Sequence, residues 1–387
     1  MLQELRRADV TTSGAKAAAL GTMLRAGLPV PDGFVLPFGT ERSVTGGDLP
    51  DELHTELERA YTLLDHPVVA VRSSASGEDR AHMSAAGVHA SILGVDGIEP
   101  LIAAIRDCWD SLNSDRALAY REAAGASATH SEMSVIVQSV VDADVSGVMF
   151  TGASSGEATL IESSWGLGPS IVDGRVIPDT YRNEPDGTIH HKLGSKGSRL
   201  DASGGSLTSR VVHEPQRSAR SLDDEQVSTL VRLGAEIGVL LGGAQDIEWA
   251  VADEKIWILQ ARPVTAAVPS YAESPERRTA TLTGAAASTG KACGAARIVR
   301  GPQDFSRVAR GDILVCPSTD PSWTPLLGIA GGVVTERGGS LAHAATVARE
   351  LGIPAVLGVT NATSRLTDGS IITIDGDLGT VVEHQPT

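Results

Sequence analysis

The chain contains 387 residues, of which 41% are hydrophobic and 21% are charged, so it is long enough for two or three domains with separate cores. Its formal net charge of −16 argues against a nucleic acid or an anionic membrane as a partner, although a local basic pocket for a polyanion stays open. The chain has no apolar run long enough to cross a bilayer and no secretion signal at its N-terminus, which predicts a cytoplasmic protein.

The first predicted elements are a helix over residues 11–21 that continues toward Arg25 and a strand over residues 33–36. Lys16 follows Gly14 at the start of this helix, where its ammonium group can contact phosphates. The signal is short, and a solvated lysine explains it at least as well. Lys16 is therefore a candidate phosphate ligand that needs support from other motifs.

A β-branched run that starts at Val68 predicts a buried strand, which ends in Arg72 and a loop rich in serine and glycine. The Arg72 guanidinium can bind a phosphate through two hydrogen bonds. The loop continues through Ser84 and Gly87, whose neighbours are small enough to let backbone N–H groups approach an anion. The pattern predicts a polyphosphate site, but a plain surface turn fits it equally well.

The next segments predict mainly core elements. Residues 97–126 have a helical period that places Leu101, Cys108 and Trp109 on one face. Strands are predicted at residues 133–141, 146–151 and 158–162, followed by a turn at 164–168. The three cysteines, Cys108, Cys293 and Cys316, lack the spacing of metal ligands, so we expect buried and reduced thiols.

Residues 182–220 are polar and rich in glycine and serine, which predicts a long loop that carries Lys192 and Lys196. A helix is predicted from about Asp223 to Leu241, with Ser221 as its N-cap.

A hairpin of two strands is predicted at residues 245–250 and 256–263. Because side chains alternate along a strand, Asp246, Glu248, Gln260 and Arg262 are expected on one face. Two carboxylates and an amide are suitable Mg²⁺ ligands when phosphates complete the coordination shell. An exposed polar face is the alternative explanation of this pattern.

Residues 266–280 contain prolines and mixed charges and predict a linker, and residues 281–387 predict short strands with glycine turns around one helix. That helix begins near Ala342 after Gly338 and Gly339, and Gly352 and Pro354 end it. His343 is therefore predicted in the first turn, where the helix dipole favours an anion and a neutral, nucleophilic imidazole. A histidine that only caps or packs is the alternative.

The run from Thr335 to Val356 resembles the phosphohistidine signature of the PEP-utilising enzymes, a family that includes phosphoenolpyruvate synthase, pyruvate phosphate dikinase and rifampin phosphotransferase. In this family the histidine that matches His343 carries a phosphoryl group from ATP to an acceptor. Ala342 stands where the family usually has serine or threonine.

The N-terminal part resembles the ATP-grasp domain of the same family. The matching motifs, in the family's order, are Gly14-Ala-Lys16, Val71-Arg-Ser-Ser-Ala75, Glu78-Asp79, Ser84 with Gly87, Val137-Gln138, Ser146-Gly-Val148 with Phe150-Thr151, Glu162 with Trp165-Gly-Leu-Gly168, Gln245-Asp-Ile-Glu-Trp249 and Leu259-Gln-Ala-Arg-Pro263. Pro169 departs from the acidic residue that usually follows the Trp-Gly-Leu-Gly motif.

The resemblance implies an α+β fold: an ATP-grasp domain over residues 1–265, the linker 266–280, and a small swivelling phosphohistidine domain over residues 281–387. It implies ATP and Mg²⁺ as cofactors. By resemblance the nucleotide is bound by Lys16, Arg72, Ser84, Gly87, Gln138, Glu248, Gln260 and Arg262, the metal by Asp246, Glu248 and Gln260, and the catalytic residues are His343, Arg72 and Arg262.

The expected function is that of a dikinase-type phosphotransferase, which converts ATP to AMP and phosphate and transfers a phosphoryl group through phospho-His343 to a small-molecule acceptor. The family's acceptor domains do not fit into the 15-residue linker. One alternative is a subunit of a split phosphoenolpyruvate synthase whose acceptor domain is a separate protein. Another is a nucleotide-binding carrier or sensor without turnover.

Overall fold

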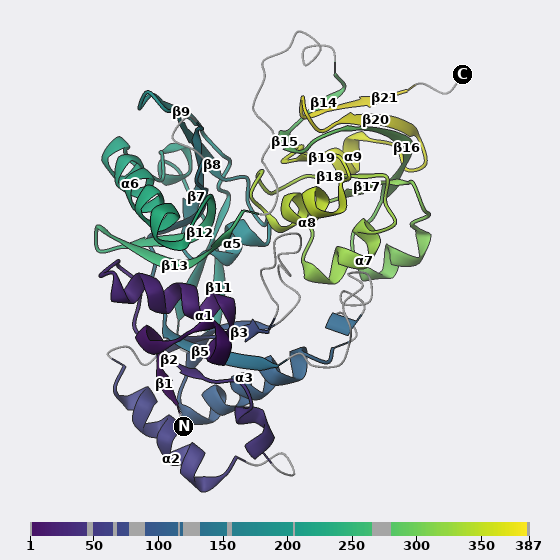
Figure 1. Ribbon diagram of the computed structural model, residues 1–387. Helices are drawn as coiled ribbons and strands as arrows, with labels where there is room; N and C mark the ends of the chain where they lie inside the picture. The colour runs from purple at the N-terminus through teal and green to yellow at the C-terminus, as the bar shows by residue number, and fades with distance from the viewer. Residues whose placement is uncertain are drawn as a thin grey trace.

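The computed structural model describes residues 2–44, 49–64, 68–76, 90–114, 117–118, 132–152, 157–203, 206–264 and 280–384. Three sheets are formed before residue 265 and one after residue 279 (Figure 1). We call these two groups the N-terminal lobe (residues 2–264) and the C-terminal lobe (residues 280–384). The predicted linker 266–280 lies outside the described residues, except for Ala280.

The first sheet of the N-terminal lobe is antiparallel throughout and has five strands. Its strands, in spatial order, are β1 (Gln3–Glu4), β2 (Gly33–Leu36), β5 (Met133–Ser139), β3 (Val68–Ala75) and β4 (Ser91–Asp96). Helices α2 (Asp51–Thr62) and α3 (Ile98–Ser111) bury apolar residues against one face, and these include Leu57, Leu101 and Ile105.

The second sheet has six antiparallel strands, in the order β13 (Lys255–Pro263), β12 (Gln245–Ala252), β6 (Val145–Phe150), β7 (Thr159–Trp165), β8 (Asp179–Asn183) and β9 (Ile189–Lys192). One core joins both sheets through helices α1 (Val10–Arg25) and α6 (Asp224–Leu241). A two-stranded ribbon of β10 (Ser198–Ser203) and β11 (Ser206–Val211) and the short helix α5 (Pro169–Val172) complete this lobe.

The C-terminal lobe is built on one eight-stranded sheet, in the order β14 (Leu282–Thr283), β21 (Thr380–Glu383), β20 (Ile371–Asp375), β16 (Lys291–Ile298), β17 (Ile313–Cys316), β18 (Gly332–Thr335), β19 (Ala355–Leu357) and β15 (Ala285–Ser288). Strands β16 to β19 are parallel. The helices of this lobe are α7 (Thr324–Leu327), α8 (His343–Leu351) and α9 (Ala362–Arg365). Apolar side chains fill both faces of the sheet.

Several predicted elements are confirmed. Helix α1 and strand β2 have the predicted positions, and β12 and β13 pair as a hairpin. His343 is the first residue of α8, and Gly352 ends that helix in a left-handed conformation with φ 66°. Short 3-10 helices lie at Leu5–Arg7, Thr40–Ser43, Gln216–Ser218, Pro302–Arg307 and Pro321–Trp323. In the ranges that the structure describes, no helix combines the length and apolar character needed to cross a bilayer.

Other predictions were wrong in their boundaries. Within the range 97–126, helix α3 ends at Ser111, because the amides of Leu112 and Asn113 turn back to Trp109 and Asp110. Residues 115–116 and 119–126 of this prediction lie outside the described residues. Asp223, not Ser221, is the N-cap of α6, since its side chain accepts from the Gln226 amide in a capping box.

The prediction of a long loop over residues 182–220 was also wrong. This region contains β9, β10 and β11, whose side chains are mostly solvent-accessible, so the polar composition hid the strands. The predicted turn at 164–168 was placed too early, because β7 continues through Trp165. Cys108 and Cys316 are buried free thiols as predicted, but Cys293 is exposed, since it faces outward on β16.

Candidate active site

A cavity of about 680 Å³ lies between the two lobes. Helix α8 is at the side of the C-terminal lobe that faces the N-terminal lobe in Figure 1. The cavity wall includes these predicted site residues: Lys16, Arg72, Gln138, Glu248, Gln260, Arg262 and His343. Both lobes thus contribute residues to this cavity. Lys16 and His343, for example, are more than 320 positions apart in the sequence. Ser84 and Gly87 lie outside the described residues.

Lys16 reaches the cavity because α1 packs its first turns against the end of β3. Gly14 has a φ of 78° inside α1, and a Cβ there would lie 2.5 Å from the Ser74 Oγ, so glycine is required twice over. The Lys16 ammonium group donates to the carbonyl oxygen of Ser73 at 2.9 Å. This contact fixes the cation beside the strand that carries Arg72.

Arg72 is buried and contacts both strands of the β12–β13 hairpin. Its NH1 lies 3.6 Å from the Glu248 Oε2 and 3.3 Å from the Gln260 Oε1. Glu248 and Gln260 are direct cross-strand partners, which confirms the predicted shared face. A carboxylate, an amide oxygen and a guanidinium therefore meet at one place on the cavity wall.

Asp246 and Arg262 form the next cross-strand pair on the same face of the hairpin. The Asp246 Oδ2 accepts from the Arg262 Nε at 2.8 Å and lies 2.7 Å from its NH2. Asp246 is buried and does not belong to the cavity wall, whereas Arg262 does. Burial raises the pKa of the Asp246 carboxyl, and the Arg262 charge opposes this rise.

The side chains on the cavity wall offer few ligands for a divalent metal. Within the ranges that the structure describes, no group of three or more histidine, cysteine, aspartate or glutamate side chains could hold one. Glu248 and Gln260 nevertheless bring two side-chain oxygens to the same guanidinium group, since Glu248 forms an ion pair with Arg72 and Gln260 accepts a hydrogen bond from it. Mg²⁺ commonly takes one or two protein ligands and completes its shell with phosphate and water oxygens, so this pair fits a metal that arrives with a nucleotide.

His343 is buried at the first position of α8, and the side chain of the preceding residue, Ala342, provides no cap. The His343 Nδ1 lies 3.3 Å from the Thr319 Oγ1. Ala342 has no hydroxyl group, and the Thr319 hydroxyl lies next to the imidazole instead. Sequence reasoning missed Thr319 because it lies 24 positions earlier, and no local motif links the two residues.

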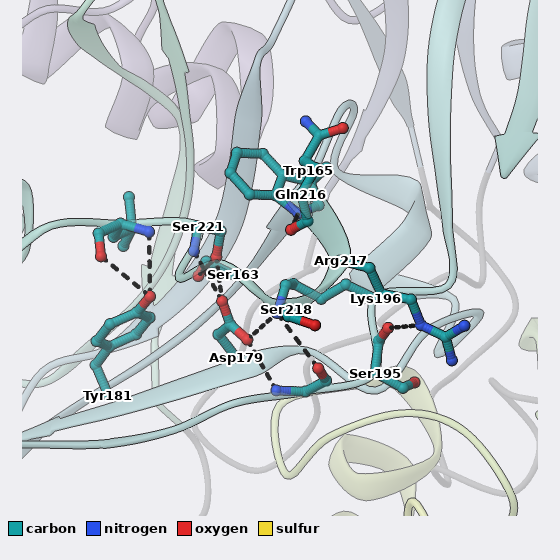
Figure 2. Close-up of polar contacts among 12 residues, drawn as sticks. Ser163, Trp165, Asp179, Tyr181, Ser195, Lys196, Gln216, Arg217, Ser218 and Ser221 are labelled. Carbon is teal, nitrogen blue, oxygen red and sulfur yellow. Dashed lines mark hydrogen bonds and ion pairs between the residues drawn. The ribbon is translucent and has the colours of Figure 1, made fainter. Parts of the chain in front are cut away.

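The ribbon of β10 and β11 also contributes Leu200, Leu207 and Ser209 to the cavity wall, and β11 contacts β4. A buried ion pair anchors the segment that leads into this ribbon (Figure 2). Lys196 is fully buried, and its ammonium group donates to the Asp179 Oδ1. The other Asp179 oxygen accepts from the Ser221 amide and hydroxyl at 2.9 and 2.8 Å. Lys192, predicted on the same loop, is exposed on β9.

Two protein-family profiles match the chain. One, described as pyruvate phosphate dikinase, AMP/ATP-binding domain, matches residues 39–281, and the other, described as PEP-utilising enzyme, mobile domain, matches residues 308–379. These matches confirm the resemblance and the predicted pairing of an ATP-binding part with a mobile part.

Curated relatives give the same result over nearly the whole chain. A probable phosphoenolpyruvate synthase of Methanothermobacter thermautotrophicus is 34% identical over 98% of this chain and 63% of its own length. One of Archaeoglobus fulgidus is also 34% identical, over 99% and 58%. The phosphoenolpyruvate synthase of Escherichia coli is 36% identical over 85% and 46%. The chain thus spans about half the length of the curated relatives that it matches.

Proposed function

Because the chain belongs to the PEP-utilising enzyme family, which includes pyruvate phosphate dikinase and phosphoenolpyruvate synthase, we propose that it is a dikinase-type phosphotransferase acting through His343. The observation that carries this proposal is the shared cavity, whose wall contains Lys16 and Arg72 from one lobe and His343 from the other. A cation pair can bind the polyphosphate of ATP while a nucleophile lies in the same space.

In the proposed reaction the imidazole attacks the β-phosphorus of ATP, and the bond to the oxygen that bridges the α- and β-phosphates breaks, so AMP leaves. The β- and γ-phosphoryl groups are then both on His343. Water attacks the γ-phosphorus, the bond from it to the oxygen that bridges the β- and γ-phosphates breaks, inorganic phosphate leaves, and the β-phosphoryl group stays on His343. Lys16, Arg72 and Arg262 are proposed to bind phosphate oxygens, and Asp246 orients Arg262 through their ion pair. Gln138, whose side chain donates to the Pro31 carbonyl at 3.2 Å, is proposed to lie beside the adenine.

Glu248 and Gln260 are the proposed ligands of Mg²⁺, which would neutralise phosphate charge when it binds with ATP. Arg72 contacts both of these side chains and would hold their oxygens in place before the nucleotide arrives. These contacts support the proposal that the hairpin binds the polyphosphate.

The surroundings of His343 suit a nucleophile. If the Nδ1–H donates to the Thr319 Oγ1, the lone pair on Nε2 is left for attack on phosphorus. The start of α8 stabilises the negative charge of the phosphorylated form, because backbone N–H groups and the helix dipole favour an anion there. The start of α8 thus provides a field that supports phosphoryl transfer to His343.

The acceptor is proposed to be a small molecule. The relatives are named phosphoenolpyruvate synthases, so pyruvate is the first acceptor to test. A separate protein that binds the acceptor is the alternative, and it would make this chain the ATP-handling part of a split enzyme.

The proposal is tested with β-labelled Mg-ATP. We expect an acid-labile, base-stable label on the protein and AMP as the nucleotide product. His343→Ala should abolish the label and leave the ATP dissociation constant nearly unchanged. Label that arrives from the γ-position, or ADP as the sole nucleotide product when acceptor is present, would contradict the dikinase assignment.

A further inference from the structure

A second contact between the lobes lies next to His343 and involves none of the predicted site residues. Glu162, on β7 of the N-terminal lobe, is 1% exposed. Its Oε1 accepts from the Ser340 amide at 2.6 Å and from the Ser340 hydroxyl at 2.8 Å. Its Oε2 accepts from the Leu341 amide at 3.2 Å. The donors are the residues two and three positions before the histidine.

All three of these hydrogen bonds come from the C-terminal lobe. Within the part of the chain that the structure describes, Glu162 therefore uses its carboxylate across the lobe boundary rather than to fold its own lobe. Each hydrogen bond to a carboxylate oxygen fixes a direction as well as a distance. Three of them on one turn hold that turn in a single orientation.

Gly339, which belongs to the same turn, leaves room for the Glu162 carboxylate because it has no side chain. A Cβ on Gly339 would lie 2.2 Å from the Glu162 Oε2, and the three atoms nearest to it all belong to Glu162. The φ of Gly339 lies outside the left-handed region, so its own backbone conformation does not demand glycine. The need for glycine at this position comes from the carboxylate of the other lobe.

Apolar and backbone contacts surround the same turn. Leu341 packs in a buried cluster with Val148, Phe150, Ile171 and Val176 of the N-terminal lobe. The Gly338 amide donates to the Val176 carbonyl at 2.9 Å. These contacts bury the Glu162 hydrogen bonds and exclude water, which strengthens them.

We propose that Glu162 is a positioning residue for the phosphorylation of His343: it holds the turn of residues 338–341 against the N-terminal lobe so that the imidazole faces the nucleotide cavity. This inference rests on the proposed function. Phosphoryl transfer from a bound nucleotide depends on the distance and alignment of the attacking nitrogen, so a loosely held turn slows the step without weakening nucleotide binding.

The test uses the full chain and three variants. Glu162→Gln keeps the side-chain volume but presents an amide NH₂ group to one of the donors. Gly339→Ala attacks the same contact from the other lobe. Gly328→Ala is the matched control, because it lies in the same lobe with φ −66°, and the atom nearest to its added Cβ is at 3.4 Å.

Three quantities are measured for each protein: the ATP dissociation constant, the single-turnover rate of labelling from β-labelled Mg-ATP, and hydrogen exchange at the Ser340 and Leu341 amides. Glu162→Gln and Gly339→Ala should each slow labelling by about 10- to 100-fold, because each disrupts the hydrogen bonds that Ser340 and Leu341 donate to the Glu162 side chain, with ATP affinity unchanged. Amide exchange at Ser340 and Leu341 should become faster. Gly328→Ala should match the wild type in all three.

Labelling at the wild-type rate in both variants would overturn the positioning role, as would slow labelling accompanied by an equal loss of ATP affinity. If the wild-type protein itself takes no label, the proposed dikinase function fails. The exchange measurement then still decides whether Glu162 holds the turn, because it needs no chemistry.

Discussion

Two buried carboxylates of the N-terminal lobe, Asp179 and Glu162, are satisfied in different ways. Asp179 has its charge compensated inside its own lobe, by the Lys196 ammonium group and by the amides of Gly194 and Ser221 (Figure 2). Glu162 accepts three hydrogen bonds from the other lobe, from donors 178 and 179 positions away. One carboxylate is part of a permanent core, and the other is part of a contact between lobes.

The difference lies in the charge that faces each carboxylate. A buried pair of opposite charges is costly to separate, so the Asp179–Lys196 pair fixes the chain around it. The donors to Glu162 are neutral, and the nearby Arg349 guanidinium donates instead to the carbonyl oxygens of Ala287 and Ser340. Burial raises the pKa of the Glu162 carboxyl, and these donors only oppose the rise. A contact of this kind holds the lobes together without an ion pair to break.

The largest effect that this comparison predicts is on stability. Lys196→Met should lower the free energy of unfolding by about 3–5 kcal/mol, because Asp179 is left buried without its cation. Thermal or chemical denaturation measures this loss. Lys192→Met is the matched control, since Lys192 is exposed on β9, and it should have little effect.

A double variant sharpens the same prediction. Lys196→Met combined with Asp179→Asn removes both charges and should recover part of the lost stability. A double variant as unstable as Lys196→Met alone would show that packing around residue 196, and not the uncompensated charge, dominates. Glu162→Gln, by contrast, should change the free energy of unfolding by less than about 1 kcal/mol, as expected for a residue whose partners belong to the other lobe.

This comparison also shows which features the sequence could predict. The shared face of Glu248 and Gln260 follows from the two-residue period of a hairpin, and the place of His343 follows from local helix signals. Both are short-range patterns. The resemblance to the family then predicted that the N-terminal motifs and His343 act at one site.

The contacts that the sequence could not predict join residues that are distant along the chain. The sequence around Lys196 is polar and therefore predicts a solvated loop lysine. In the structure β8 places Asp179 beside it. Thr319 and His343 meet only when β17 and β18 pair, and Glu162 meets Ser340 only when the two lobes pack. Side-chain period carries no information about such pairs, so the structure was needed to find them.

The next largest predicted effect is that of Arg72→Ala on labelling rate and ATP affinity. It distinguishes a residue that contacts the nucleotide from Glu162, which holds the turn before His343. Arg72→Ala should remove about 2–4 kcal/mol of transition-state stabilisation, because it deletes a phosphate contact and the support of Glu248 and Gln260. Unlike Glu162→Gln, it should also weaken ATP binding. Single-turnover labelling and ATP titration measure the two quantities.

Arg72→Lys is the control for charge alone. It keeps a cation but lacks the planar fork that binds two oxygens, so we expect a partial recovery of rate. Full ATP turnover in Arg72→Ala would show that Arg72 is not part of the proposed site. Arg72→Ala could then not serve as the variant against which Glu162→Gln is compared.

The smallest predicted effect is a pH dependence of the packing between the lobes. Burial raises the Glu162 pKa in the packed state, whereas an exposed glutamate titrates near its ordinary value of about 4.3. The packed state therefore binds a proton more strongly than the separated state. Between the ordinary and the raised pKa, packing is favoured at the lower pH and weakens as the pH rises.

Other groups face the same contact, and they set the control. Burial lowers the pKa of Arg349 to about 10, so this cation keeps its charge through the range in question. Burial also raises the pKa of Asp246, which interacts with the Arg349 charge. Asp246 therefore contributes its own pH dependence. Exchange at the Ser340 and Leu341 amides, corrected for the intrinsic pH dependence of exchange, should report weaker packing as the pH increases above 4. Glu162→Gln should flatten this profile except for the part due to Asp246. A wild-type profile identical to that of Glu162→Gln would mean that the three hydrogen bonds balance the burial of the Glu162 charge, and it would remove the distinction drawn between the two carboxylates.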